Sequence, residues 1–170
     1  VKGRYHQLIR ETEIDGNDWA QAHWDSIKQN YLKAPYYKEI SSWLESLYIE
    51  GNYSPLSQLN RRFIEAICAY LDINTVIRYS ADFKLVEGKT ERLADLCAQV
   101  GGSDYISGPS ARDYIDESVF ASRNITLTWF DYSGYPEYPQ LWGEFVHQVS
   151  IIDLLFNCGR NSVNFMRHVK

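Results

Sequence analysis

A chain of 170 residues is long enough to bury one hydrophobic core and short for two, so we expect a single domain over residues 1–170. Its 45% hydrophobic and 23% charged residues exclude a disordered protein, and a net charge of −5 without a run of Lys or Arg disfavours non-specific binding to nucleic acid. No apolar run reaches the ~18 residues of a membrane-spanning helix, so we expect no membrane insertion and a cytoplasmic protein.

The first predicted helix runs from an N-cap at Asn17 or Asp18 to about Tyr31. Its apolar residues recur at helical spacing, which predicts one face packed against a core. That predicted face carries Trp19, Ala22, His23, Ile27 and Tyr31.

Two more helices complete the amino-terminal half. The second begins after Pro35 and ends at Gly51. Its apolar residues follow an i, i+3, i+4, i+7, i+8 pattern, at Ile40, Trp43, Leu44, Leu47 and Tyr48. The third has Ser54 as its N-cap and Pro55 at its first helical position, and it runs to about Leu71.

After this half, strands alternate with helices. Strands are predicted at residues 74–80, 104–107 and 125–132, and helices are predicted from Thr90 to Val100, from Ser110 to about Arg123 with Asn124 closing it, and from Ser150 to Gly159. Strands separated by helices pair in parallel through right-handed crossovers. We therefore predict an α/β fold, in which a helical amino-terminal half joins a small parallel sheet in a three-layer-like arrangement with crossover helices.

The spacing of the cysteines and the absence of several known motifs disfavour some classes of site and mechanism. Cys68, Cys97 and Cys158 lie far apart in no CxxC spacing, which predicts free thiols rather than a disulfide or zinc framework. The sequence has no GxGxxG, GxxxxGK[ST], GxSxG or HExxH motif, which disfavours dinucleotide, P-loop, serine-hydrolase and zinc-hydrolase mechanisms. We therefore expect no metal and no organic cofactor.

The stretch GGSDYISGPSARDY, residues 101–114, is a candidate anion site. In an open parallel sheet, ligands bind beyond the carboxyl ends of strands, where the start of a helix offers free N–H groups. Ser107, Gly108, Ser110 and Arg112 are candidate phosphate ligands there, with Gly108 allowing close approach of the backbone. The alternative is a plain turn in which Ser110 only caps a helix.

Three polar residues lie in predicted helices. Asp153 is a candidate general base, whereas its S-x-x-D spacing from Ser150 also predicts a capping box. His23 is either an acid–base residue or a core histidine. Asn60 makes either an interhelical hydrogen bond or a ligand contact. The residues alone leave both alternatives open in each case.

Motifs spread from Tyr5 to Gly159 resemble the WbqC-like protein family. They are HWDSIKQNYLKAPYYKEI, LN at 59–60, RLADLCAQVGGSDYISGPSARDYID, YPQ at 138–140 and VSIIDLLFNCG. The matched positions are His23, Tyr31, Pro35, Asn60, Ser107, Gly108, Tyr114, Gln140, Ser150 and Asp153. Family members begin with a further strand and aromatic segment absent here, so we expect residues before Val1 and part of the active site to be missing from this chain.

The resemblance implies a bacterial protein from an O-antigen or other surface-polysaccharide gene cluster. It implies a transferase that joins an activated acyl or aminoacyl group, glycine among them, to the amine of a nucleotide-linked sugar. Residues 107–112 would hold the diphosphate, Tyr114 and Gln140 would contact substrate, and His23 or Asp153 would deprotonate the amine. The expected partners are a nucleotide sugar and an acyl donor, with no DNA and with tRNA least favoured.

Two other functions compete with the transferase. One is a non-catalytic module that binds a sugar nucleotide or a partner enzyme of the same pathway, which the lack of a recognised catalytic motif favours. The other, ranked third, is a hydrolase of acyl or amide bonds.

Overall fold

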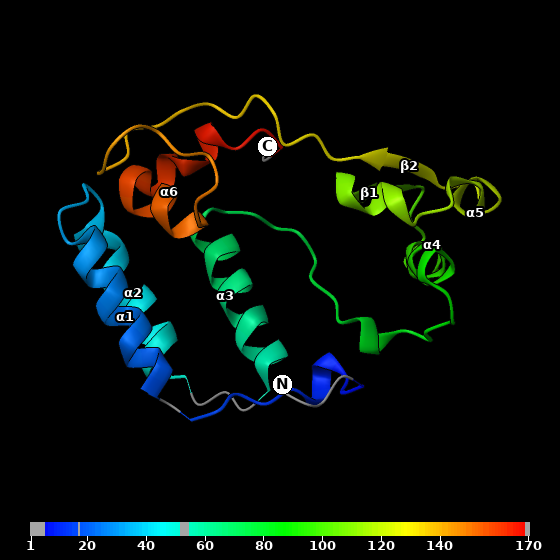
Figure 1. Ribbon diagram of the computed structural model, residues 1–170, viewed down its shortest axis with the longest axis horizontal. Coiled ribbons are helices and arrows are strands. Elements are labelled where there is room, and N and C mark those ends of the chain that lie inside the picture. The colour runs from blue at the N-terminus through cyan, green and yellow to red at the C-terminus, as the bar shows by residue number, and fades with distance from the viewer. Residues whose placement is uncertain (1–5, 17, 52–54, 169–170) are drawn as a thin grey trace. The chain divides into compact units, whose positions relative to one another are not determined.

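The computed structural model describes residues 6–16, 18–51 and 55–168 (Figure 1). The chain forms two compact units. Unit 1 comprises residues 1–75 and 135–170, and unit 2 comprises residues 76–134. Unit 2 is therefore a continuous segment, whereas unit 1 is assembled from both ends of the chain. The single domain over residues 1–170 stays a prediction.

Unit 1 is helical, and its described part contains α1 (Asp18–Tyr31), α2 (Tyr37–Ile49), α3 (Leu56–Tyr70) and α6 (Ile151–Cys158). Two 3-10 helices, η1 (Ile9–Glu11) and η4 (Gly159–Phe165), flank them. The four α-helices were predicted within a few residues, because each has apolar positions at helical spacing between recognisable ends. The predicted N-caps Asn17 and Ser54 lie outside the described residues.

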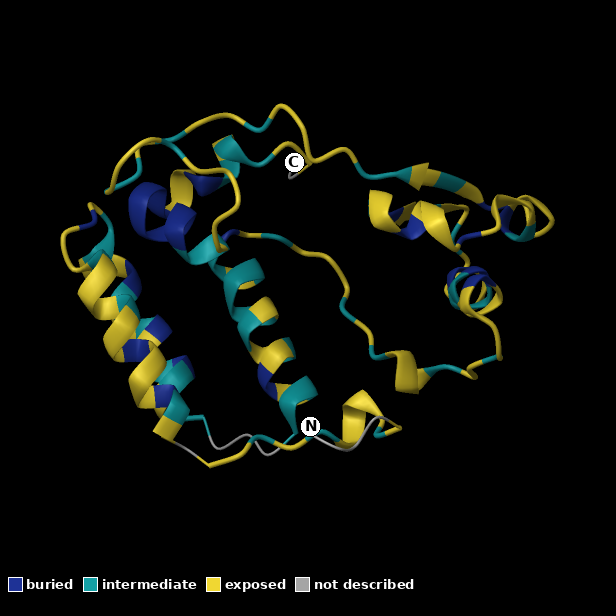
Figure 2. Ribbon diagram, viewed as in Figure 1, coloured by how far each residue is buried: buried dark blue, intermediate teal, exposed yellow. Residues whose placement is uncertain are grey.

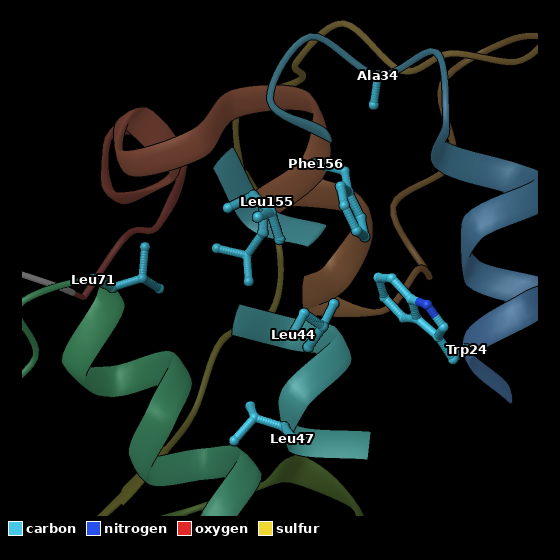
Figure 3. Close-up of a cluster of buried hydrophobic side chains, with 8 residues drawn as sticks. Trp24, Ala34, Leu44, Leu47, Leu71, Leu155 and Phe156 are labelled. Atoms are coloured by element: carbon cyan, nitrogen blue, oxygen red, sulfur yellow. The ribbon is translucent and has the colours of Figure 1, made fainter. Parts of the chain in front are cut away.

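The core of unit 1 joins side chains from both of its chain segments (Figure 3). Its buried members are Trp24, Ala34, Ile40, Leu44, Leu47, Leu71, Leu155 and Phe156. Leu155 and Phe156 of α6 are fully buried, and burying such a side chain stabilises a fold by about 1.5–3 kcal/mol. The late helix α6 is thus a principal part of the core that the early helices share.

The buried face of α1 differs from the predicted one. Ala20 and Trp24 are buried and Ile27 packs against the core, whereas Ala22 and His23 are exposed. The helical spacing of the apolar residues was predicted correctly, but the buried side of the helix is centred on Trp24 and not on His23. Trp19 and Trp24 offer similar apolar surface on different sides of the helix, and the sequence alone does not say which of them faces the core.

Unit 2 contains a parallel strand pair flanked by short helices. Its elements are α4 (Lys89–Gln99), β1 (Asp104–Ser107), α5 (Glu117–Ala121) and β2 (Thr126–Trp129), with the 3-10 helices η2 (Ser80–Asp82) and η3 (Pro109–Asp113). Asp104 lies opposite Thr126, and Ser107 lies opposite Trp129. A second buried cluster around Phe120 and Cys97 packs between helices and strands. The α/β class and the parallel pairing are confirmed.

Two predicted elements of this region are wrong. Residues 74–80 form no strand: the boundary between the two units falls after Thr75, and Val76 is 81% exposed. The described sheet consequently has two strands instead of three. The helix predicted from Ser110 is split into η3 and α5, since Asp116 begins a new helix by accepting the backbone N–H of Ser118 at 2.9 Å. The helix α5 ends at Ala121 with Ser122 as its C-cap, and Asn124, the predicted end, lies in the turn that follows with a φ of 56°.

Every helix within residues 6–16, 18–51 and 55–168 is too short or too polar to cross a lipid bilayer.

Candidate functional site

Asp153 is a carboxylate buried in the first turn of α6, a helix with most of its surface covered (Figure 2). Only 7% of the residue is exposed. Oδ1 accepts a hydrogen bond from the Tyr31 hydroxyl at 3.0 Å, and Oδ2 accepts one from the Tyr138 hydroxyl at 2.7 Å. The amide Nε2 of Gln140 also donates to Oδ2, at 3.1 Å. One donor from α1 and two from the loop before α6 therefore satisfy the buried charge.

The predicted capping box at the start of α6 is only half present. Ser150 caps the helix, because its Oγ accepts the backbone N–H of Ile152 at 3.3 Å. The Asp153 carboxylate turns instead to the three side-chain donors. Three charge-assisted hydrogen bonds outweigh one to the backbone of Ser150.

The two tyrosines of this cluster are held as protonated donors. Burial, the hydrogen bond to Asp153 and the charge of that carboxylate together raise the pKa of Tyr31 to about 12. Burial likewise raises the pKa of Tyr138, with a smaller contribution from Asp153 and an opposing one from Gln140. Neither phenol can serve as a base near neutral pH.

Gln140 links Asp153 to the loop that precedes α6. Its Nε2 donates to the carbonyl oxygen of Val146 at 2.9 Å, and its Oε1 accepts the Val146 N–H at 2.9 Å. Nearby, the indole N–H of Trp142 donates to the carbonyl oxygen of Asn30 on α1, at 3.1 Å. The predicted substrate ligand Gln140 is thus engaged with the protein's own chain.

His23 and Asn60 line one pocket of about 350 Å³ in unit 1. The other lining residues are Ile14, Trp19, Tyr48, Leu56, Leu59 and Phe63. The His23 ring lies edge-on to Trp19, with centroids 5.4 Å apart, and edge-on to Tyr48, at 6.4 Å. Both His23 and Asn60 are exposed. The fold therefore brings together two predicted site residues, one from α1 and one from α3.

Local packing builds the walls of this pocket. The ring of Tyr48, on α2, packs edge-on against Phe63 of α3 with centroids 4.7 Å apart. At the start of α3, the N–H of Leu56 donates to the carbonyl oxygen of Thr12 at 2.9 Å. This backbone contact fixes the segment that carries Ile14 beside α3. Two of the lining residues, Tyr48 and Phe63, also pack against the core of unit 1.

The predicted anion loop lies in unit 2 and lacks the start of a long helix. Ser107 is buried at the end of β1, and Ser110 lies in the five-residue 3-10 helix η3. Gly108 has a φ of −68°, which any residue adopts, and a Cβ there would make an ordinary contact with the Tyr132 hydroxyl at 3.6 Å. The backbone therefore does not require glycine at this position.

Arg112 and Lys89 of unit 2 each lie over an aromatic ring. The Arg112 guanidinium carbon is 5.2 Å from the ring centroid of Trp129, and Lys89 Nζ is 5.5 Å from that of Tyr114. Thr90, at which the sequence predicted the start of α4, follows the N-cap Gly88 by two residues, and its hydroxyl donates to the carbonyl oxygen of Tyr114 at 3.3 Å. A phosphate site at Arg112 stays a prediction.

The cysteines are free thiols, as predicted, and they lie on α3, α4 and α6. Cys97 and Cys158 are buried. Burial raises the pKa of the Cys158 thiol, and the charge of Asp153 raises it further. A protonated, covered thiol is a poor nucleophile.

The predicted site residues thus fall into three groups. His23 and Asn60 share the aromatic pocket, and Asp153 and Gln140 share the polar cluster, both within unit 1. The third group, in unit 2, is Ser107, Gly108, Ser110, Arg112 and Tyr114. Sequence reasoning missed Tyr31 as a partner of Asp153 and the aromatic walls around His23. The nearest signal was the i, i+7 spacing of Trp24 and Tyr31 on α1, which places Tyr31 on the side of the helix that packs against the core.

Comparisons with known proteins agree with the motif pattern. The model of the WbqC-like protein family matches residues 1–165. An uncharacterized protein, Rv1507c, from Mycobacterium tuberculosis (strain ATCC 25618 / H37Rv), is 53% identical over 170 residues, which are all of this chain and 74% of that protein. No solved structure matches the chain.

Proposed function

The chain belongs to the WbqC-like protein family, and from this premise we propose that it transfers an activated acyl or aminoacyl group, glycine among them, to the amine of a nucleotide-linked amino sugar. Family membership relates the chain to proteins of bacterial surface-polysaccharide clusters. The observation that carries the proposal is the pocket in which His23 and Asn60 meet aromatic rings. Aromatic rings with a few polar groups suit a sugar, which has apolar C–H faces and a polar rim.

The reaction needs one base near the sugar amine. The amine nitrogen attacks the acyl carbonyl carbon, an N–C bond forms, and the bond from the acyl carbon to its thiol or adenylate leaving group breaks. The nitrogen must lose a proton, and His23 accepts it in the proposed mechanism. Because His23 is exposed at the pocket, it can return this proton to water or to the leaving group.

Asp153 is the less suitable base. Its carboxylate already accepts hydrogen bonds from Tyr31, Tyr138 and Gln140. Taking a proton from a substrate would disrupt at least one of these bonds in a buried site. We therefore assign Asp153 to holding the loop before α6 and His23 to proton transfer.

The test measures transfer from a thioester donor to UDP- and dTDP-linked amino sugars. His23→Gln should lower turnover by about 10²–10⁴-fold without changing the thermal unfolding midpoint. His147→Gln is the matched control, because His147 is also exposed and edge-on to an aromatic ring, that of Phe145. Wild-type turnover in His23→Gln would contradict the proposed base.

The second candidate is a non-catalytic module that binds a sugar nucleotide of the same pathway. The full engagement of Asp153 and Gln140 in internal hydrogen bonds favours it, because it withdraws two candidate reactive groups from substrate. Binding of the sugar nucleotide without turnover by the full-length protein, with any acyl donor, would support this module. We place either role in the cytoplasm, in keeping with the free thiols.

A further inference from the structure

We infer that the pocket of His23 and Asn60 holds a single amino-sugar ring, and that the nucleotide part of the substrate stays outside it. This inference rests on the proposed function, since it takes an amino sugar as the ligand. Size, charge and the angles between the aromatic rings support it independently.

The size of the pocket suits one ring. Small-molecule pockets span ~300–1,000 Å³, and this one, at about 350 Å³, is near the lower limit. A nucleotide-linked sugar comprises a base, a ribose, a diphosphate and the transferred sugar. A pocket of this size accommodates one of these groups rather than the whole molecule.

The lining of the pocket argues against the diphosphate. None of its eight described lining residues is Lys or Arg, and His23 is the one side chain among them that can carry a positive charge. Burying a diphosphate requires several charged or N–H donors. The phosphates therefore lie outside, where water or other groups can solvate them.

The ring planes argue against the nucleotide base. The planes of Trp19 and Tyr48 make an angle of 59°, those of His23 and Tyr48 make 71°, and those of Tyr48 and Phe63 make 68°. A flat base stacks on one open aromatic face. These rings instead contact one another edge to face or tilted, with centroids 4.7–6.4 Å apart, and so present an uneven apolar wall that suits a puckered sugar.

Asn60 provides the polar recognition in this pocket. Its side-chain amide offers both donors and an acceptor, and it lines the pocket from α3, as His23 does from α1. A sugar hydroxyl can bind the Asn60 amide while the sugar amine lies near the imidazole. The two polar residues would thereby fix which edge of the ring is presented for transfer.

The experiment separates the sugar from the nucleotide. Binding of the methyl glycoside of the amino sugar, of UDP and of the UDP-linked amino sugar is measured by saturation-transfer NMR and calorimetry. The expected result is that the glycoside binds alone, and that Asn60→Ala weakens it at least tenfold while UDP binding is unchanged. Gln58→Ala is the control, because Gln58 is exposed on the same helix and does not line the pocket.

Two results would overturn the inference. One is a loss of UDP binding in Asn60→Ala as large as the loss of glycoside binding. The other is no binding of the glycoside while the UDP-linked sugar binds wild type and Asn60→Ala equally. Transfer activity is measured in a separate assay. Binding of the glycoside at the pocket without transfer from any donor would refute the transferase and would still support the sugar subsite.

Discussion

Asp153→Asn tests the polar cluster of α6 most directly. The asparagine keeps the size of the side chain and removes its charge, and it has one acceptor oxygen where the carboxylate has two. The amide nitrogen then faces donors, and the Gln140 amide cannot turn into an acceptor without losing its bond to Val146. Net values of about 1.5–3 kcal/mol apply to each hydrogen bond to a charged group. With one or two such bonds lost and water reaching the half-buried tyrosines, we expect a loss of about 2–4 kcal/mol in the free energy of unfolding.

The assay is urea unfolding at pH 7, followed by circular dichroism. Asp25→Asn is the control, because Asp25 is exposed on α1 and its hydrogen bond comes from Gln21 on the same helix. The control should change the free energy of unfolding by less than about 0.5 kcal/mol. A similarly small effect of Asp153→Asn would refute the role of the carboxylate as an anchor. Unchanged stability with a large loss of turnover would identify Asp153 as the base instead.

Three further predictions concern other parts of the chain. Burial and the neighbouring Asp153 raise the pKa of Tyr31 from 10.0 to about 12, so the stability that protonated Tyr31 contributes should be complete below pH 10 and be lost as the pH rises toward 12. Tyr31→Phe should reduce this slope in thermal unfolding, and equal slopes would contradict the shift. Gly159→Ala should lower the free energy of unfolding by about 2–4 kcal/mol in a denaturant titration, because Gly159 has a φ of 57° and a Cβ would overlap the Tyr36 ring. A decrease below about 1 kcal/mol would argue against that overlap. Arg112→Ala should lower the free energy of unfolding by about 0.5–1 kcal/mol, since this exposed cation lies over Trp129. In a binding titration, a loss of about 1.5–3 kcal/mol in the affinity for a nucleotide sugar would support the predicted phosphate site.

Elements with a clear period and clear ends could be predicted from the sequence. The helix α2 lies between Pro35 and Gly51, and α6 begins directly after its cap Ser150. Gly159 ends α6 in a positive-φ conformation, which favours glycine. The strand pair in unit 2 followed from the same logic, because a helix between two apolar runs implies a parallel crossover.

Contacts over long sequence distances could not be predicted. Residues 74–80 have the β-branched composition of a strand, but composition does not show whether a neighbouring strand exists. Tyr31 and Asp153 meet across 122 residues, and no local pattern records that contact. The predicted helix from Ser110 is interrupted because Asp116 caps a new helix by accepting the N–H of Ser118. The Asp-x-Ser spacing is compatible with such a cap but does not by itself distinguish it from the interior of a helix.

The interrupted arrangement of unit 1 has a consequence for synthesis on the ribosome. The helices α1, α2 and α3 are synthesised before α6. Their core side chains, Trp24 and Leu44 among them, therefore lack their contacts with Phe156 until α6 has been made. Unit 2 is a continuous segment, so it can fold before α6 has been synthesised. A nascent chain stalled before α6 therefore presents an apolar surface to chaperones or to other chains.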